Sequence, residues 1–308
     1  MIINAVNCNF ELNGRGVRAV FDAMHDELAK ARPHLLVRQE DVDGEAKGGT
    51  LWDEADERLG LRVYPNPKTW TSVAIDKSVF RSVRGHDVGD YLPASARVLQ
   101  LRQAGPDSLP FVASSAHLAY ANPPLREIQA YEMTRLADKV MPIGQDQTPV
   151  KLPLLAAMDS NSFPEPGTPG DVALPTAQQI TDKTHLIHRA REVEPGVWEM
   201  DTRPDRILRS NNLLEDAARY ASTVLGQTDA LAPTTYATTT HGPAARVDRW
   251  YLSRQLLPAV AFVKVIPVRK FSDHHIVVVG LDSDRLTEVL HGLVVQAKNN
   301  PLYAPVPA

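Results

Sequence analysis

The sequence predicts a single α/β domain with at least two β-sheets. Three observations support this fold class. The chain has 308 residues, of which 43% are hydrophobic, enough for a substantial core. Short aliphatic runs bounded by proline or polar turns recur along the chain, as expected of buried strands. Helical and strand patterns alternate in the early part of the chain, whereas strand patterns dominate later.

The early part begins with a predicted strand at residues 1–8, "MIINAVNC". Apolar residues at helical spacing then run from Val17 to Leu28, and Pro33 ends this helix because the residue before a proline disfavours helical backbone. A second helix should open at Pro123-Pro124 and place Leu125, Ile128, Leu136 and Val140 on one face. Further strands are expected at 34–39, 71–75, 97–101, 109–116 and 151–158.

The final third offers strand patterns at 246–253, 259–266 and 274–281. Before them, a helix with Leu214, Ala217, Ala218, Ala221 and Leu225 on one face should stop at Gly226. A last helix runs through Leu286, Val289, Leu290 and Leu293. The proline-rich stretches 163–175 and 301–308 are expected to be a loop and a tail. We therefore expect one domain over residues 1–282, followed by an extra helix and a proline-containing tail over 283–308.

Composition limits the functional classes. The formal net charge is −4, so no global positive field would gather nucleic acid, and phosphate contacts would need local clusters. Cys8 is the only cysteine, which excludes an internal disulfide. The first nine residues lack the pattern of a secretory leader, and no apolar run approaches the roughly 20 residues of a membrane span. We expect a cytoplasmic protein without membrane insertion and without an obligate protein partner.

Polar side chains gather where the predicted strands begin or end. Ligand sites of layered α/β folds form at such positions. Each residue taken alone could be a turn or a helix cap, but their recurrence favours a site. Carboxylate and amide oxygens with few imidazoles suit a hard cation such as Mg²⁺ or Mn²⁺. The residues concerned are Glu40, Asp41, His117, Asp159, Asn161, Asp248, Asp273 and His274.

Read in order, six stretches resemble the motifs of the endonuclease/exonuclease/phosphatase family. They are "NCNFELNG" (7–14), "PHLLVRQE" (33–40), "PFVASSAHL" (110–118), "LLAAMDSNS" (154–162), "ARVDRWYLS" (245–253) and "FSDHH" (271–275). Departures from the family pattern are Met158 where glycine usually precedes the aspartate, Trp250 and Tyr251 in place of a simpler pair, and a helix after the closing strand. Together the six motifs span nearly the whole chain, from residue 7 to residue 275.

The resemblance implies a four-layer α/β (α+β) sandwich, in which two packed β-sheets are flanked by helices. It also implies a hydrolase of phosphoesters that depends on Mg²⁺ or Mn²⁺. Glu40 would be the main metal ligand, with Asn9 beside it and Asn7 as the competing choice from the same strand face. Asp273 would support the metal directly or through water.

The remaining site roles also follow from the resemblance. Asp159 would orient or deprotonate the attacking water, and Asn161 would hold a phosphoryl oxygen. His274, paired with Asp248, would contact the phosphate or act as general base, and His117 would be a second donor. Outside this set, Arg246 could bind substrate phosphate or form an ion pair with a neighbouring strand. We expect His275 to be structural, because it should point away from its neighbour His274.

Two alternative functions are weighed. Gly14-x-Gly16-x-x-Ala19, followed by an acid at Glu40 or Asp41, matches the spacing of a dinucleotide-binding fingerprint and would suit an NAD(P)-dependent oxidoreductase. The first glycine lies several residues past the strand, however, which disfavours a helix N-terminus at the pyrophosphate. The second alternative is a catalytically degenerate binding module. His185 and His188 share one helical face, but two imidazoles without a third ligand are weak evidence for zinc.

The identity of the substrate is the most detailed level of the functional prediction. The composition shows neither a broad basic face nor many aromatic residues, of which there are 6%. We favour a phosphodiester substrate, which could be nucleic acid, and hence a phosphodiesterase or nuclease.

Overall fold

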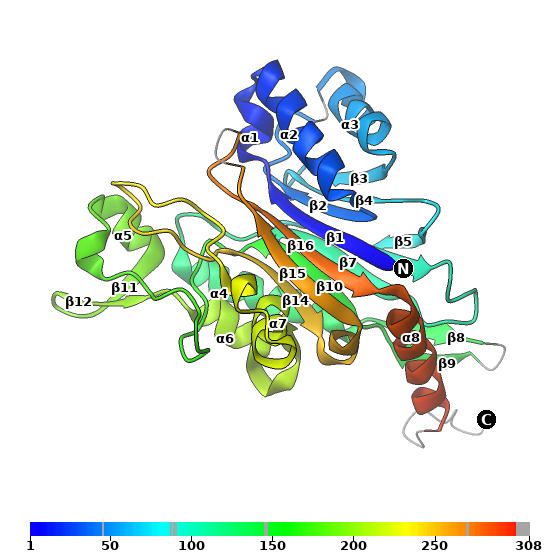
Figure 1. Ribbon diagram of the computed structural model, residues 1–308. Helices are drawn as coiled ribbons and strands as arrows, with labels where there is room; N and C mark the ends of the chain where they lie inside the picture. Colours follow the sequence, from blue (N-terminus) through cyan, green and yellow to red (C-terminus); the bar gives the residue numbers. More distant parts are fainter. Residues whose placement is uncertain (45, 87, 89–90, 145–146, 269–270, 300–308) are drawn as a thin grey trace.

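Two six-stranded β-sheets packed face to face form the body of the computed structural model (Figure 1). The structure describes residues 1–44, 46–86, 88, 91–144, 147–268 and 271–299. The predicted tail at 301–308 lies outside these residues. The helices are α1 (Glu11–Arg15), α2 (Arg18–Ala31), α3 (Ala46–Leu59), α4 (Pro123–Thr134), α5 (Lys183–Arg189), α6 (Arg203–Arg209), α7 (Ala217–Leu225) and α8 (Ser283–Lys298).

The first sheet has the strand order β15-β16-β1-β2-β4-β3. β1 runs parallel to β2 and antiparallel to β16, so the sheet is mixed. The second sheet has the order β13-β14-β10-β7-β6-β5, with β7 and β10 parallel. The strands of the first sheet are β1 (Ile2–Asn9), β2 (Leu35–Gln39), β3 (Arg62–Asn66), β4 (Thr71–Ile75), β15 (Val260–Ile266) and β16 (Ile276–Asp282). Those of the second are β5 (Phe80–His86), β6 (Ala94–Leu101), β7 (Phe111–His117), β10 (Leu154–Asp159), β13 (Leu214–Asp216) and β14 (Asp248–Ser253).

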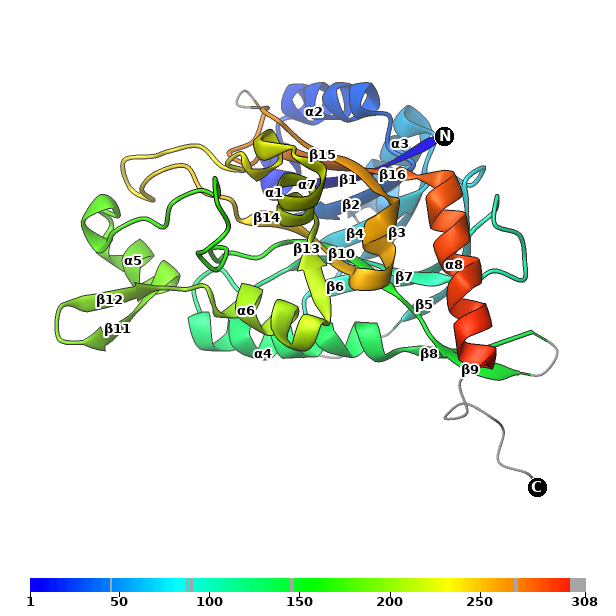
Figure 2. The same ribbon diagram turned by 60° about the horizontal axis from the view of Figure 1, so that its bottom comes forward.

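Helices cover the outer face of each sheet and complete four layers. In the view of Figure 2, α2 and α3 lie above the first sheet, and α4 and α6 lie below the second. Two further strand pairs, β8 (Val140–Ile143) with β9 (Thr148–Lys151) and β11 (Ala190–Glu194) with β12 (Val197–Met200), project beyond the sheets. This is the predicted sandwich of two β-sheets flanked by helices.

Strand alternation decides which side chains face the space between the sheets. In β1, Ile3 and Ala5 belong to the core that both sheets share, whereas Val6 and Cys8 pack with Phe21 and Met24 of α2. Because side chains alternate along a strand, Asn7 and Asn9 continue the inner face. β14 also directs side chains at the opposite sheet, since the Trp250 indole donates to the carbonyl of Val277 in the first sheet, 3.3 Å away. The polar residues of β1 therefore point at the second sheet.

Two predicted helices differ from the structure at one end. The helix expected from Pro123 through Val140 ends at Thr134, and Val140 instead begins β8. β8 pairs with β9, and this non-local pairing overrides the apolar spacing. Leu214 lies in β13 and not in the helix, because the carboxylate of Asp216 caps α7 by accepting a hydrogen bond from the amide of Ala218.

The predicted C-terminal helix is present as α8. Leu286 and Leu290 are buried in the core shared by the sheets, so this helix packs on the sandwich along one face. The carboxylate of Asp282 caps it by accepting from the amides of Asp284 and Arg285. No helix within the described ranges is both long and apolar enough to cross a membrane.

His25 on α2 makes stability depend on pH. Its ring is buried between Phe10 and Phe21, and Nδ1 lies 2.8 Å from the carbonyl of Phe21. Burial lowers the pKa of His25 to about 3 from 6.5. Between pH 6.5 and pH 3, His25 binds a proton in the unfolded chain but not in the folded protein. The contribution of the buried, neutral His25 to the free energy of unfolding is therefore complete above pH 6.5 and is lost as the pH falls.

We therefore expect wild type to lose about 2 kcal/mol more stability than His25→Leu when the pH drops from 6.5 to 5, at roughly 1.4 kcal/mol per pH unit. Urea unfolding of both proteins across this range measures the difference, and other titrating groups cancel between them. Parallel stability curves would contradict the assignment.

Candidate active site

The polar cluster lies at one end of the cleft between the two sheets, where four strands stop. β1 and β2 run parallel in the first sheet, and their last residues, Asn9 and Gln39, are paired. β7 and β10 run parallel in the second sheet, and their last residues, His117 and Asp159, are paired. Strand ends from both sheets therefore present side chains to one small volume.

Asn9 joins the two sheets at this point. Its amide nitrogen donates to a carboxylate oxygen of Glu40, 3.1 Å away, and to one of Asp159, 3.0 Å away. The other oxygen of Glu40 accepts from the backbone amide of Leu12 at 2.9 Å. Asn9 itself is held by the amide of Glu11, which donates to its side-chain oxygen at 3.0 Å. These bonds fix one carboxylate from each sheet beside the other.

Asp159 stands at the centre of the cluster. Its Oδ2 lies 3.5 Å from Nε2 of His117 and 3.8 Å from Nε2 of His274, and its Oδ1 accepts from the amide of Asn161 at 2.8 Å. Burial opposes its ionisation, but the neighbouring His274, His117 and Arg189 outweigh burial and lower the pKa of Asp159. The carboxylate is therefore ionised at neutral pH.

His274 and Asp248 form a buried pair. Nδ1 of His274 lies 2.8 Å from Oδ2 of Asp248, which fixes the ring so that Nε2 faces Asp159. Burial disfavours the imidazolium, but the carboxylates of Asp248 and Asp159 outweigh it and raise the pKa of His274 to about 10. His274 therefore carries a positive charge at neutral pH, next to an ionised carboxylate.

Two of these residues adopt left-handed backbone conformations. Glu40 has φ 55° and Asn161 has φ 48°. Asn tolerates this region because its short side chain can bond locally, whereas Glu is uncommon there. In Glu40 the turn directs the carboxylate back over the end of β2 toward Asn9. The side-chain Nδ2 of Asn161 donates to the carbonyl of Leu118 at 2.8 Å, which leaves the second N–H of this side-chain amide available.

Three predicted site residues lie at the edge of the cluster or outside it. Asn7 is buried one layer deeper, where its side-chain oxygen accepts from Gln39 at 3.0 Å, so Asn9 and not Asn7 contacts Glu40. Asp273 is 51% exposed, and its carboxylate lies 3.9 Å from Nε2 of His274. The metal-support role of Asp273 stays a prediction.

Arg246 does not lie among the residues that line the pocket at this cluster. Its guanidinium is 1% exposed and is held by Asp171, at 2.7 Å, and by Asp216, at 2.5 Å. The two carboxylates accept three hydrogen bonds from the guanidinium, which ties the loop before β14 to the start of α7 and to residue 171. The substrate-binding role expected as one option for Arg246 is therefore corrected to the other option, a structural ion pair.

The cluster opens into a pocket of about 330 Å³. Asn161 and His274 are among the residues that line it. Sequence reasoning missed several other lining residues, because most of them come from irregular segments without periodicity. These are Tyr120, Thr235, Tyr236, His241 and Trp70, together with Leu12 of α1 and Arg189 at the end of α5.

His185 and His188 lie on α5, as their spacing suggested, but they do not form a metal site with a third ligand among the described residues. His185 stacks on His241 with ring centroids 3.9 Å apart and lies 3.0 Å from the hydroxyl of Tyr120. His275 precedes β16, which begins at Ile276 and not at the predicted residue 274; it is buried, does not line the pocket, and packs edge-on against Tyr236.

The dinucleotide-binding alternative is wrong. Gly14 and Gly16 have φ 79° and 70° and shape an irregular turn at α1, while α2 begins only at Arg18. β2 is followed in the sheet by the antiparallel β4, which no doubly wound nucleotide fold would show at that place. The acid at Glu40 faces Asn9 and not a helix N-terminus.

The donor set fits a hard divalent cation. Ligand atoms of Glu40, His117 and Asp159 lie within 4.8 Å of one another, as do those of Asp159, Asp248 and His274. The carboxylates of Glu40 and Asp159 come from different sheets, both accept from the side-chain amide of Asn9, and both lie within 3.8 Å of Nε2 of His117, so a cation between them would relieve their repulsion. Each group combines two carboxylates with one imidazole, a set of ligands that can hold a divalent cation.

Comparisons with known proteins agree on the fold. No family model matches the sequence, and no curated protein sequence matches it. Among solved structures, the catalytic domain of human Nocturnin has a TM-score of 0.55 at 15% identity, covering 91% of this chain and 93% of its own. The mannosyl-6-phosphatase Bt3783 of Bacteroides thetaiotaomicron has a TM-score of 0.55 at 14% identity, covering 90% and 98%.

A third similar structure is an endonuclease/exonuclease/phosphatase from Bacteroides vulgatus, with a TM-score of 0.57 at 10% identity, covering 91% of this chain and 98% of that one. All three alignments span both sheets, since they cover nine tenths of the chain or more. The chain therefore has the fold of the endonuclease/exonuclease/phosphatase proteins, which the order of its strand-end motifs implied.

Proposed function

We propose that this protein is a divalent-metal-dependent phosphoester hydrolase of the phosphodiesterase or nuclease type. The observation that carries the proposal is the environment of Asp159. Oδ2 of this ionised carboxylate accepts a hydrogen bond from Asn9, which also donates to Glu40, and it lies within 3.8 Å of Nε2 of both His117 and His274. Such an arrangement offers negative charge to a cation and a water, and positive charge to a phosphoryl group, within one small pocket.

Glu40 and Asn9 would hold the metal, with Asp159 completing the oxygen ligands or orienting the attacking water. When bound, Mg²⁺ or Mn²⁺ supplies positive charge to the phosphoryl oxygens and lowers the pKa of a coordinated water. Asn9 contributes by keeping Glu40 and Asp159 together, since it donates to both. Asp159 would accept a hydrogen bond from the attacking water and so orient one of its lone pairs toward phosphorus.

The two histidines would neutralise charge on the phosphoryl oxygens. His274 remains protonated at neutral pH because Asp248 and Asp159 favour its charged form, so we assign it as a charged hydrogen-bond donor and not as the base. His117 faces the same carboxylate from the second sheet and would donate from the opposite side. The free N–H of Asn161 would bind a third oxygen.

A phosphodiester is the substrate class that we favour. Two aromatic side chains, Trp70 at 47% exposed and Tyr120 at 45%, line the pocket and offer faces on which bases could stack. One similar structure is the endonuclease domain of TRAS1, a telomere-specific retrotransposon, at 14% identity and a TM-score of 0.53. Another, at 14% identity, is a sugar phosphatase, so monoesters belong in the test.

The deciding experiment measures hydrolysis of plasmid DNA, RNA, bis-p-nitrophenyl phosphate and p-nitrophenyl phosphate with Mg²⁺, with Mn²⁺ and with EDTA. We expect turnover of diesters that EDTA abolishes and added metal restores. Asp159→Asn, purified identically, excludes a contaminating enzyme because its activity should vanish. Binding of these esters without turnover of any would instead support the degenerate binding module.

A further inference from the structure

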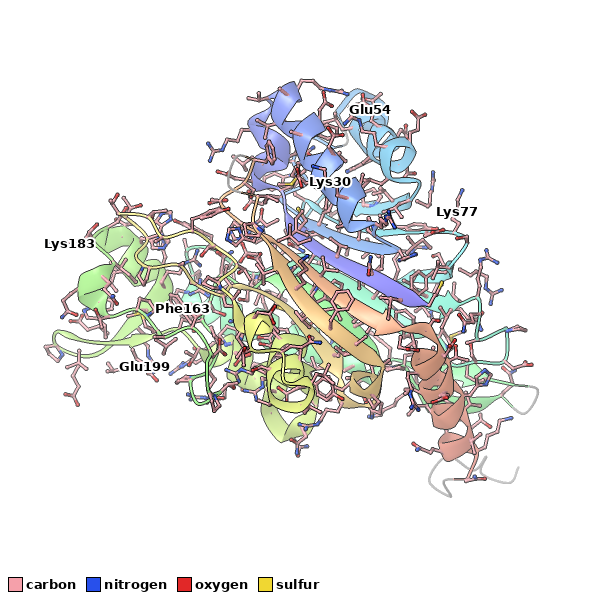
Figure 3. All side chains as sticks on the ribbon, viewed as in Figure 1. Lys30, Glu54, Lys77, Phe163, Lys183 and Glu199 are labelled. Carbon is pink, nitrogen blue, oxygen red and sulfur yellow. The ribbon has the colours of Figure 1, made fainter. Side chains whose placement is uncertain are left out.

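Two residues that line the pocket, His185 and Arg189, come from a part of the chain outside the sandwich. This arm, residues 177–200, comprises a short 3-10 helix (Ala177–Gln179), α5 and the β11–β12 hairpin, and it projects from the sheets in Figure 1. Figure 3 labels Lys183 and Glu199 on the arm and Phe163 where the arm meets the body. Phe163 packs with Ile180 and Met200 of the arm in a separate small core.

Arg189, the last residue of α5, brings a positive charge from the arm into the pocket. One nitrogen, Nη1, donates to the backbone carbonyl of Asn161 at 2.5 Å, and the guanidinium carbon lies 5.0 Å from the ring centre of Tyr120. Among the described residues, no carboxylate forms an ion pair with Arg189, and this is its only hydrogen bond to them. Its remaining N–H groups are free for a ligand.

Two other buried arginines have carboxylate partners. Arg246 is held by Asp171 and Asp216. Arg126 pairs with Asp201 at 2.6 Å and also donates to three backbone carbonyls, including that of His188. Arg126 thereby fixes the backbone next to Arg189. Arg189 differs from both, because no carboxylate among the described residues forms an ion pair with it and it lines the pocket.

Two imidazoles that line the pocket with Arg189 add no charge of their own. Burial lowers the pKa of His185 to about 3, and burial also lowers the pKa of His241. Both rings are therefore neutral at neutral pH. Among the residues described as lining this pocket, Arg189 is the only lysine or arginine. The wall consequently presents one fixed cation, framed by Tyr120 and two neutral imidazoles.

The geometry points to Arg189 as the binding residue for a second anionic group of the substrate, a phosphate or a carboxylate next to the phosphoester that is cleaved. This inference rests on the proposed hydrolase function. In the proposed function the cleaved group has His117 and His274 as its donors, both next to Oδ2 of Asp159, whereas Arg189 contacts the body at the carbonyl of Asn161. A guanidinium matches two oxygens of a phosphate or carboxylate, and a partly buried one binds them strongly.

The test compares matched substrates. Thymidine 5′-(p-nitrophenyl phosphate) carries one phosphate, its 3′-phosphorylated form adds a second, and its 3′-O-carboxymethyl form adds a carboxylate. We expect wild type to prefer at least one doubly charged ester by about 10- to 100-fold in kcat/KM, the size expected of a charged hydrogen-bonded pair. Arg189→Gln should lose that preference while still hydrolysing the singly charged ester, and Arg189→Lys should retain part of it.

Arg191→Gln is the matched control, because Arg191 lies on the same arm, pairs with Glu199 and does not line the pocket. It should keep the wild-type preference. Calorimetric binding of thymidine 3′,5′-bisphosphate and of thymidine 5′-monophosphate gives a readout that needs no turnover. Which of the two doubly charged esters is preferred identifies the anion.

Two results would overturn the inference: no preference for either doubly charged ester in wild type, or a preference that Arg189→Gln retains. Failure of the proposed function looks different. In that case none of the three esters is hydrolysed, while the bisphosphate still binds more tightly than the monophosphate in an Arg189-dependent manner. Melting temperatures of the Arg189 variants identify any loss of folding, and Arg189→Lys supplies a folded comparison if the glutamine variant is unstable.

Discussion

Replacement of His274 by glutamine is expected to lower kcat for phosphodiester hydrolysis by about 10²- to 10⁴-fold. The side chain of His274 is the one imidazole of the cluster that a buried carboxylate holds charged, through the 2.8 Å contact with Asp248. Glutamine can still donate to Asp248, so the buried carboxylate keeps a partner. It cannot place a positive charge beside the phosphoryl oxygens. Turnover should fall while the fold remains.

His274→Ala adds a second comparison. It should lose as much turnover as the glutamine variant but more stability, because Asp248 is left buried without its partner. His275→Gln is the matched control, since this neighbouring imidazole packs on Tyr236 and does not line the pocket. Steady-state kinetics at saturating Mg²⁺ and urea unfolding measure the two effects. A glutamine variant that keeps a tenth or more of the wild-type kcat would refute the role.

The second large effect is expected for Glu40→Gln, which should weaken Mn²⁺ binding by about 100-fold. Glutamine has nearly the same shape and can still accept from the amide of Leu12, so the turn after β2 is preserved. It lacks the negative charge that the cation requires. Isothermal titration with Mn²⁺ in the absence of substrate measures the loss directly, independent of any activity.

Asp273→Asn is the contrast to Glu40→Gln. The wild-type carboxylate of Asp273 is half exposed. It belongs to neither of the two groups of side chains whose ligand atoms lie close enough together to hold one ion. Its loss should weaken Mn²⁺ binding by less than about 10-fold, as for an outer partner. Equal losses in both variants would place Asp273 among the direct ligands. Unchanged binding in Glu40→Gln would remove Glu40 from that set.

The sandwich and the position of the cluster could be predicted from local patterns. Strand alternation put Asn7 and Asn9 on one face, and polar residues at strand ends identified Glu40, His117 and Asp159. Such signals are strong because a buried strand has a fixed period and a definite end. The order of the motifs then supplied the fold. Distances could not be predicted, and the choice of Asn9 over Asn7 needed the 3.1 Å contact with Glu40.

The residues that were missed or misplaced depend on partners far away in the chain. Arg246 lies close to Asp248 in sequence, but its carboxylate partners are at positions 171 and 216, in a loop and at a helix cap. Arg189 reaches the pocket because Arg126 and Asp201 tie the arm to α4. No periodicity records such contacts. α3 and the β11–β12 hairpin escaped prediction for the related reason that their exposed faces weaken the apolar pattern.

The left-handed backbone at Glu40 has a consequence for stability. Glycine would adopt φ 55° without steric penalty, whereas a side chain there costs on the order of 1 kcal/mol. A glycine at the end of β2 would relieve this strain, but it would also remove the hydrogen bonds that the carboxylate accepts from Asn9 and from the amide of Leu12. The strained backbone is therefore a stability cost that accompanies a carboxylate at this position, as expected where stability and chemistry oppose each other.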